Sequence, residues 1–324
     1  MHSMIVRLAA AAATISAVLV GSGSANAFPD KPVTLIVPWP PGGATDALAR
    51  ILAQRLGERL EQTVIVDNRP GAGGNIGTAS FVREEADGHT LIMATSSTNA
   101  VNPHLYATLG FDPIADFAPV AFVASIPNLL EVPANSPFTD VASLVEFAKA
   151  NPGQLNYASG GVGSSQHLAG SMFTHLTGTE ITHVPYQGSG PAVTDLIAGH
   201  MDMMLDTGSL TQVKDGALRA IAVAAEERLP SLPDVPTIEE AGFGPMQASA
   251  WYAIAAPAGT PEPIVERLNA DIVAVLARDD IRERLETMGA VLREPMSPAE
   301  VKAFFASEIA RYESIVANSG ASIN

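Results

Sequence analysis

Residues 36–46 read IVPWPPGGATD, and this stretch decides the fold that the sequence predicts. An apolar run typical of a β-strand ends at prolines, two glycines follow, and a helical pattern begins at Ala44. In parallel α/β sheets, ligands bind beyond the carboxyl ends of strands, where helices begin. The first amides of a helix have no partner within it, and its dipole adds about half a positive charge there. The junction therefore suits an anion without a lysine or arginine, although a plain tight turn would use the same residues.

Three further segments follow the same pattern of an expected strand and then an uncharged loop. They are residues 155–167 (LNYASGGVGSSQH), 94–103 (ATSSTNAVNP) and 184–192 (VPYQGSGPA). In these loops hydroxyls and backbone amides replace cationic side chains. Trp39 either stacks on a ligand or shields its loop, and Tyr186 offers an aromatic wall or a hydroxyl. Asp46 caps free amides or accepts from a ligand. Asp206 ends the expected strand Met201–Leu205, and we expect its side chain to face the same ligand cleft as these loops.

The first 27 residues have the pattern of a signal peptide. Arg7 precedes an apolar stretch, and Ala25-Asn26-Ala27 forms an A-x-A cleavage site. The apolar stretch is too short to span a bilayer, which takes about 20 residues. We therefore expect export to the periplasm with cleavage after Ala27, which would leave 297 of the 324 residues.

Composition narrows the possible functions. The chain has no cysteine, so disulfides and thiolate metal sites are excluded. Its formal charge of −16 argues against nucleic acid as a partner, because an acidic protein repels phosphate backbones. The seven histidines show no metal-binding spacing, and we expect neither a metal nor a cofactor.

The order of the expected elements predicts two α/β domains with mostly parallel sheets, because strand-like runs alternate with helical patterns. The expected helices include Ala44–Leu60, Asn75–Ala86 and Val141–Ala150, with Pro298 opening the last one. The chain is expected to cross between domains near 125–128 and 244–250. This gives a discontinuous first domain, 28–126 with 249–324, an inserted second domain, 127–248, and a ligand cleft between them.

Two catalytic or cofactor interpretations fit poorly. Gly71, Gly73 and Gly77 approach a dinucleotide fingerprint, but their spacing is wrong and Pro70 precedes them. Ser164 with His167 or His183 would suggest an exported serine hydrolase, but the chain contains no G-x-S-x-G motif. That hydrolase stays open as the alternative from another functional class.

Six motifs, in this order, carry a family likeness: KPVTLIVPWPPGGATDALAR, VIVDNRPGAGGNIG, NYASGGVGSSQHLAG, HVPYQGSGPAVTDLIAGH, LPDVPTIEEAGF and APAGTP. Together they closely resemble the Bug, or TctC-like, extracytoplasmic solute receptors of tripartite tricarboxylate transporters. The resemblance covers essentially the whole chain after residue 27. It implies a type II-like periplasmic-binding-protein fold with a hinge, no enzymatic activity, and capture of a small carboxylated solute for a membrane permease.

The resemblance also implies specific site residues. A carboxylate clamp would comprise Gly43, Ala44, Asp46, Gly163, Ser164 and Ser165. The other cleft residues carried over are Ser96, Ser97, Tyr186 and Asp206. Many members have a lysine after VPY where this chain has Gln187, which argues against a highly charged tricarboxylate. The protein is expected to be a monomer, and a sensor subunit that presents bound solute to a regulator is the alternative sharing the same site.

Overall fold

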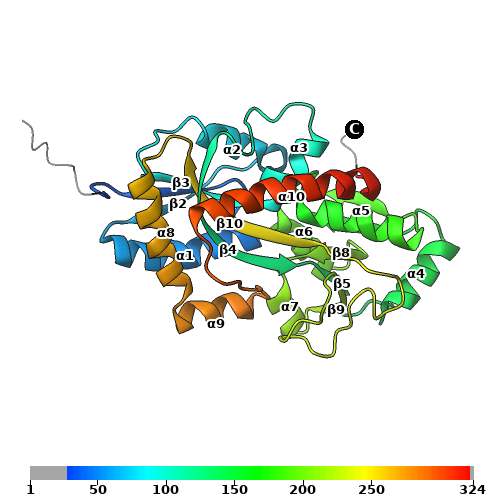
Figure 1. Cartoon of the computed structure of the whole chain (residues 1–324). Coiled ribbons are helices and arrows are strands. Elements are labelled where there is room, and N and C mark those ends of the chain that lie inside the picture. The colour runs from blue at the N-terminus through cyan, green and yellow to red at the C-terminus, as the bar shows by residue number, and fades with distance from the viewer. Residues whose placement is uncertain (1–27, 322–324) are drawn as a thin grey trace, which may run out of the picture.

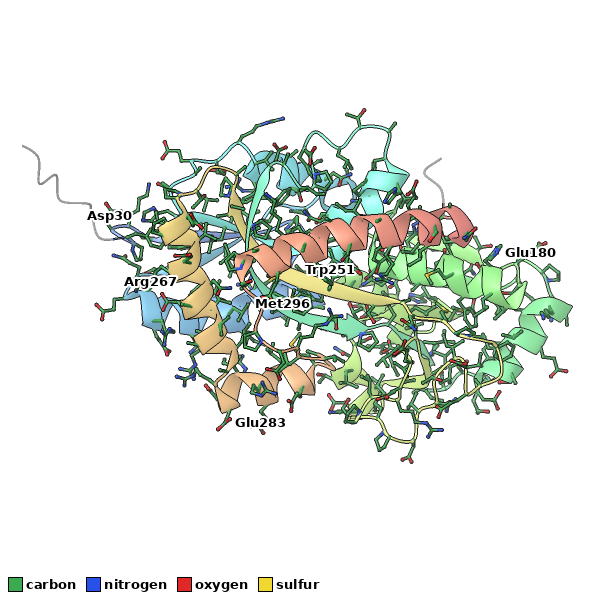
Figure 2. All side chains as sticks on the ribbon, in the orientation of Figure 1. Asp30, Glu180, Trp251, Arg267, Glu283 and Met296 are labelled. Atoms are coloured by element: carbon green, nitrogen blue, oxygen red, sulfur yellow. The ribbon has the colours of Figure 1, made fainter. Side chains whose placement is uncertain are left out.

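The computed structural model describes residues 28–321, which form two α/β lobes lying side by side (Figure 1). The predicted signal peptide, residues 1–27, lies outside the described residues. Each lobe is built on a five-stranded sheet with helices against its faces. Asp30 of the first lobe and Glu180 of the second lie near opposite ends of the molecule (Figure 2).

The first lobe contains the sheet β2-β1-β3-β10-β4. β1 pairs in parallel with β2 and β3, whereas β10 runs antiparallel to both β3 and β4, so four strands share one direction and β10 is reversed. The elements of this lobe are β1 (Val33–Val37), α1 (Ala44–Leu60), β2 (Val64–Asn68), the 3-10 turn η1 (Ala72–Gly74), α2 (Asn75–Phe81), β3 (Thr90–Thr95), the π-helical turn η2 (Ser97–Val101), α3 (Asn102–Leu105), β4 (Phe117–Pro127), β10 (Ser249–Pro257), α8 (Glu262–Leu276), α9 (Asp279–Thr287) and α10 (Pro298–Ser319).

The second lobe repeats this plan in the sheet β7-β6-β8-β5-β9. β6 is parallel to β7 and β8, and β5 is the reversed strand between β8 and β9. Its elements are β5 (Leu129–Pro133), α4 (Val141–Ala150), β6 (Asn156–Ser159), α5 (Ser165–Thr177), β7 (Thr182–Pro185), α6 (Ser189–Ile197), β8 (Met203–Asp206), α7 (Leu210–Lys214) and β9 (Leu218–Val223).

The chain passes between the sheets at two adjacent places. The long strand β4 leads at Asn128 into β5, and the segment ending at Ala248 leads into β10. Asn128 donates from both its backbone and its side-chain nitrogen to the carbonyl of Ala248, at 2.9 and 2.8 Å. The two connections therefore lie side by side, and the reversed strand of each sheet is the one that directly follows a connection.

The predicted elements mostly have the expected type. Ala44–Leu60 and Val141–Ala150 form helices with the predicted bounds, whereas the helix expected over Asn75–Ala86 ends at Phe81, where the chain turns. The sequence did not predict α7, α9 or the helical turns from Ser97 to Leu105. α7 and these turns are very short, and α9 buries only Ile281 and Leu285. The prediction of mostly parallel sheets is correct in that all strands but one in each sheet run in the same direction. The reversed strand nevertheless makes half of the pairings in each sheet antiparallel.

The helices are held by their apolar faces. Leu48, Leu52 and Leu56 of α1 are buried in the core of the first lobe. α10 lies across both lobes in Figure 1, where it contacts β4, η2 and α5. The ring centroid of Phe305 on α10 lies 5.1 Å from that of Trp251 on β10. Trp251 lies beneath α10 in Figure 2. Burial of such rings is the main favourable contribution to packing of this helix.

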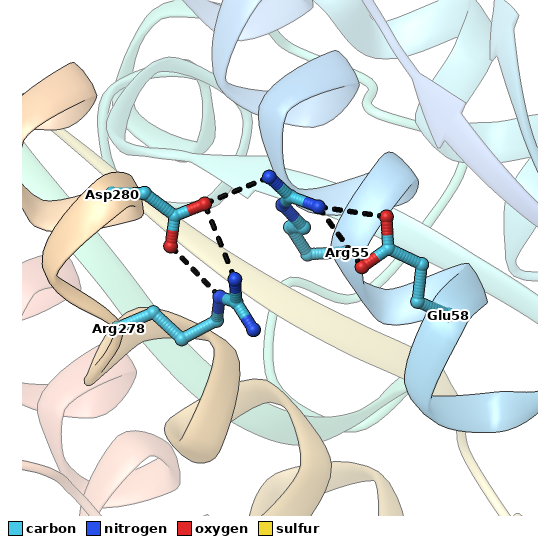
Figure 3. Close-up of polar contacts among 4 residues, drawn as sticks. All are labelled: Arg55, Glu58, Arg278 and Asp280. Carbon is cyan, nitrogen blue, oxygen red and sulfur yellow. Dashed lines mark hydrogen bonds and ion pairs between the residues drawn. The ribbon is translucent and has the colours of Figure 1, made fainter.

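Charged side chains join helices at the surface of the first lobe. Asp280 of α9 accepts from Arg55 of α1 at 2.8 Å and from Arg278 at 2.8 Å, and Arg55 also bonds Glu58 (Figure 3). These four side chains are partly exposed, so solvent and salt screen the attraction between them.

We predict that Phe305→Ala lowers the free energy of unfolding by about 3–5 kcal/mol, because a ring that is almost fully buried leaves a cavity. Asp280→Asn should have a much smaller effect, which shrinks further as salt is added. Urea unfolding followed by circular dichroism measures both. Equal losses for the two variants would contradict this account of how α10 and α9 are held.

Candidate functional site

A cavity lies between the two lobes. Its walls combine loop and helix-start residues of both sheets with part of β10. The first lobe contributes Trp39, Pro40, Gly43, Ala44, Thr45, Thr95, Ser96, Ser97, Ala250 and Tyr252. The second lobe contributes Gly160, Ser165, Gln166, Gly188, Ser189 and Thr207.

Three helices begin at this cavity. Ala44, Ser165 and Ser189 are the first residues of α1, α5 and α6, and all three line the cavity wall. Gly43 and Gly188, the residues before α1 and α6, supply no side-chain cap. The first amides of α1 and α6 therefore lie at the cavity without a capping side chain, whereas Ser164 caps the start of α5. The dipoles of all three helices make this region positive.

The cavity wall carries no ionised side chain among the residues described here. Its polar groups are hydroxyls, the amide of Gln166 and backbone amides, while Trp39 and Tyr252 add aromatic surface. Positive potential at this site must therefore come from the backbone. Such an arrangement binds a carboxylate through oriented N–H donors.

Asp46 does not line the cavity but holds the loop that does. Its carboxylate accepts from the Gly42 amide at 3.1 Å and from the side chains of Arg50 and Asn68 at 3.0 Å. Burial by itself raises the pKa of Asp46, but these hydrogen bonds outweigh burial and lower the pKa below its ordinary value. Asn68 also donates to the Trp39 carbonyl at 3.0 Å, so the whole Trp39–Gly43 turn is tied to the end of β2.

Asp206 has the matching position in the second lobe, behind the cavity wall. Its Oδ1 accepts from Gln166 Nε2 at 2.9 Å and from Ser189 Oγ at 2.7 Å, and its Oδ2 accepts from the Gly208 amide at 2.9 Å. Because Gln166 and Ser189 belong to α5 and α6, one carboxylate fixes the starts of two helices. The donation from Nε2 also directs the Gln166 carbonyl oxygen away from Asp206.

Glu131 on β5 is a second buried acid beside this network. It is fully buried and accepts from Ser209 Oγ at 2.6 Å, while its other carboxylate oxygen has no hydrogen-bond partner among the described residues. Burial, and in smaller part the negative charge of Asp206, raises the pKa of Glu131 well above its ordinary value. Burial therefore favours the protonated, uncharged form of Glu131 in the folded protein.

The structure places the predicted site residues in two groups. Trp39, Gly43, Ala44, Ser96, Ser97 and Ser165 line the cavity. Asp46, Gly163, Ser164, Tyr186 and Asp206 are not among the lining residues. Ser164 caps α5 by accepting from the His167 amide, and the Tyr186 hydroxyl donates to Asp195 at 2.7 Å.

Sequence reasoning did not identify most of the other residues that line the cavity. Gln166, Gly188 and Ser189 lie within loops that it had selected, so the loop pattern could have indicated them. Tyr252 and Ala250 lie in a strand that reads as plain core, and no local signal marks them.

The hydrolase interpretation fails on geometry. The Ser164 hydroxyl accepts from the backbone amide of His167 and makes no hydrogen bond to an imidazole among the described residues. His167 and His183 stack at 4.3 Å, and burial lowers the pKa of each to about 4. Ser159 does meet His183 at 2.7 Å, but Ser159 is itself fully buried.

Within residues 28–321, no group of three or more acidic or histidine side chains is placed to hold a metal ion. Across the same residues, no helix combines the length and the apolar character that crossing a membrane requires.

The protein has two α/β lobes with a cavity between them, and three helices begin at this cavity. This arrangement defines a solute-binding protein of the periplasmic type. The family model described as "Tripartite tricarboxylate transporter family receptor" (TctC) matches residues 48–321. The chain therefore belongs to this family, whose structurally known members are solute-binding proteins and not enzymes. The two-domain fold predicted from the sequence is confirmed.

Individual relatives agree with this assignment. BugT of Bordetella pertussis is 36% identical over 93% of this chain and 93% of its own. A Rhodopseudomonas palustris protein solved with adipate is 39% identical, with a TM-score of 0.87 over 91% of this chain and 99% of that one. MatC of the same species, solved with bound malate, is 35% identical, with a TM-score of 0.85 over 89% of this chain and all of that one.

We predict that Glu131→Gln makes stability less sensitive to alkaline pH. A carboxyl whose pKa is raised by folding contributes stability that is complete below its unfolded pKa and is lost as pH rises through the folded value. Glutamine keeps the shape and the bond from Ser209 but cannot ionise. Urea unfolding from about pH 5 to 9 should show that the free energy of unfolding of the variant increases relative to that of the wild type as pH rises.

Glu146→Gln on the exposed side of α4 is the matched control, and it should follow the wild-type profile. Parallel profiles for Glu131→Gln and the wild type would show that Glu131 is not held protonated by the fold.

Proposed function

We propose that this protein captures a small carboxylate in the periplasm and delivers it to the membrane permease of a tripartite tricarboxylate transporter. One observation carries the proposal: α1, α5 and α6 all begin at a cavity whose wall contains no ionised side chain. A site with several free amides and no ionised side chain on its wall favours an anion and offers no carboxylate that could contact a cation directly.

The chemistry of the cavity wall favours a mono- or dicarboxylate. Backbone amides come from both lobes, and hydroxyls with Trp39 and Tyr252 remain for an uncharged chain between acid groups. The structural relatives with adipate and malate support this class. Gln187 is exposed and lies outside the cavity wall, so it adds no charge for a third carboxylate.

Capture requires the lobes to close around the solute. We infer that residues 28–126 with 249–324 move as one domain and residues 127–248 as the other. The adjacent connections at Asn128 and Ala248 support a hinge there, because rotation is needed at only two neighbouring segments. Delivery to a permease fits the family, and cleavage after Ala27 would release a monomeric receptor into the periplasm.

Calorimetric titration of the wild type with adipate, malate, benzoate and citrate tests the function. We expect one site, with a mono- or dicarboxylate bound more tightly than citrate and recovered unchanged after denaturation. Failure of every carboxylate to bind, or recovery of an altered solute, would contradict the proposal.

We predict that Ala44→Pro weakens carboxylate binding about 10- to 150-fold, the cost of losing a hydrogen bond to a charged group. Proline is well tolerated at the first position of a helix, and Gly43 already has the extended backbone that precedes proline. The substitution therefore removes one amide donor from the cavity wall and leaves the helix intact. Calorimetry with the best carboxylate measures the loss.

Asp279→Pro is the matched control, because Asp279 is the exposed first residue of α9 and its preceding residue is likewise extended. It should bind like the wild type. Wild-type affinity for Ala44→Pro would remove the start of α1 from the site.

A further inference from the structure

Residues 160–166 of the second lobe form a loop that carries part of the cavity wall. The first lobe also contacts the middle of this loop. Gly160, Ser165 and Gln166 line the cavity, whereas Val162 and Gly163 do not. The Tyr106 hydroxyl, from the segment after α3 of the first lobe, donates to the Val162 carbonyl at 3.2 Å. This hydrogen bond joins the two lobes without touching the space where a solute would lie.

Asn102 makes a second contact with the same loop. It is fully buried, and its Nδ2 donates to the Gly73 carbonyl at 2.9 Å and to Asn75 Oδ1 at 2.7 Å. Both partners are acceptors, so the amide nitrogen must face them and Oδ1 faces the other way. A Cβ atom added to Gly163, whose φ is +84°, would lie 2.5 Å from that Oδ1. Only glycine permits this approach.

Gly73 completes the contact and explains the glycine-rich motif that resembles a dinucleotide fingerprint. Its φ is +63°, and a Cβ atom there would lie 2.7 Å from the Val162 carbonyl oxygen and 2.9 Å from the Tyr106 hydroxyl. The motif thus lets the first lobe approach the backbone of the second. It binds no phosphate in this arrangement, because the space beside it is filled by Val162 and Tyr106.

We propose that Gly73, Asn102 and Tyr106 of the first lobe and Val162 and Gly163 of the second form a latch that holds part of the ligand-free molecules closed and thereby sets solute affinity. The five residues make contacts that exist only when the lobes meet, and none of them lines the cavity. A ligand that binds the closed state has an apparent Kd inversely proportional to the closed fraction. The part of the inference that concerns affinity rests on the proposed function.

Distance measurement between two spin labels tests the latch without any solute. The chain has no cysteine, so Gln54→Cys and Ala198→Cys place one label on an exposed position of each lobe. We expect two populations of distances in the ligand-free wild type, and Tyr106→Phe should deplete the shorter one. Gly163→Ala should deplete it further, because the added methyl group meets Asn102.

Tyr157→Phe is the matched control. Its hydroxyl makes a hydrogen bond of the same length, 3.2 Å, to Ser171 within the second lobe, so it loses one bond that does not cross between lobes. This control should keep the wild-type distances. If Gly163→Ala does not fold, the comparison of Tyr106→Phe with Tyr157→Phe still decides the question.

Calorimetry with adipate and malate then measures the effect on affinity. Tyr106→Phe should weaken both by the same factor, about 2- to 10-fold for one hydrogen bond, because the latch does not contact the solute. A single long distance in the ligand-free wild type, or distances and affinities for Tyr106→Phe equal to those of Tyr157→Phe, would overturn the latch. Shifted distances with no carboxylate bound by the wild type would support the latch and overturn the proposed function instead.

Discussion

The amides at the start of a helix have no partner within the helix, and this constraint shapes the site. α1, α5 and α6 direct such amides at one cavity, and two of the three are preceded by glycines that cannot cap them. The fold therefore builds positive potential from peptide groups whose positions are set by whole helices. A lysine in the same place would be flexible and strongly hydrated, whereas these donors need no reorganisation when an anion arrives.

Acidic side chains support this site from behind rather than entering it. Asp46 holds the turn before α1, and Asp206 holds the starts of α5 and α6. Each of these carboxylates accepts at least three hydrogen bonds in all. Burial and the nearby charge of Asp206 both favour the protonated form of Glu131, because two adjacent carboxylates in a low-dielectric interior cannot both ionise cheaply. In a chain of charge −16, recognition of an anion must be local, and the acids contribute by fixing donors in place.

Glycines have a different part at the boundary between the lobes. A Cβ atom on Gly208 would lie 3.2 Å from the Ala44 nitrogen, and one on Gly188 would lie 2.9 Å from Pro40. At Gly73, Gly163 and Gly188 an added side chain would force a neighbouring group to shift, and at Gly208 it would be tightly packed, so these glycines allow the two lobes to approach closely. The contact between the two lobes thus depends on the absence of side chains at these glycines as much as on hydrogen bonds.

The sequence by itself determined the elements and the loops that matter. The uncharged loops after strands at 36–46, 94–103 and 155–167 are local patterns, so the sequence singled them out. The resemblance to the receptor family then assigned Gly43, Ala44, Ser96 and Ser165 within them. Only the tertiary structure decided which side of each loop faces the cavity. Asp46 and Ser164 turn inward to hold helix starts, and Tyr252 reaches the wall from a strand that looks like core. The contacts of Gly73 with Val162 and of Asn102 with Gly163 join residues far apart in the chain, and no local pattern encodes such a distance.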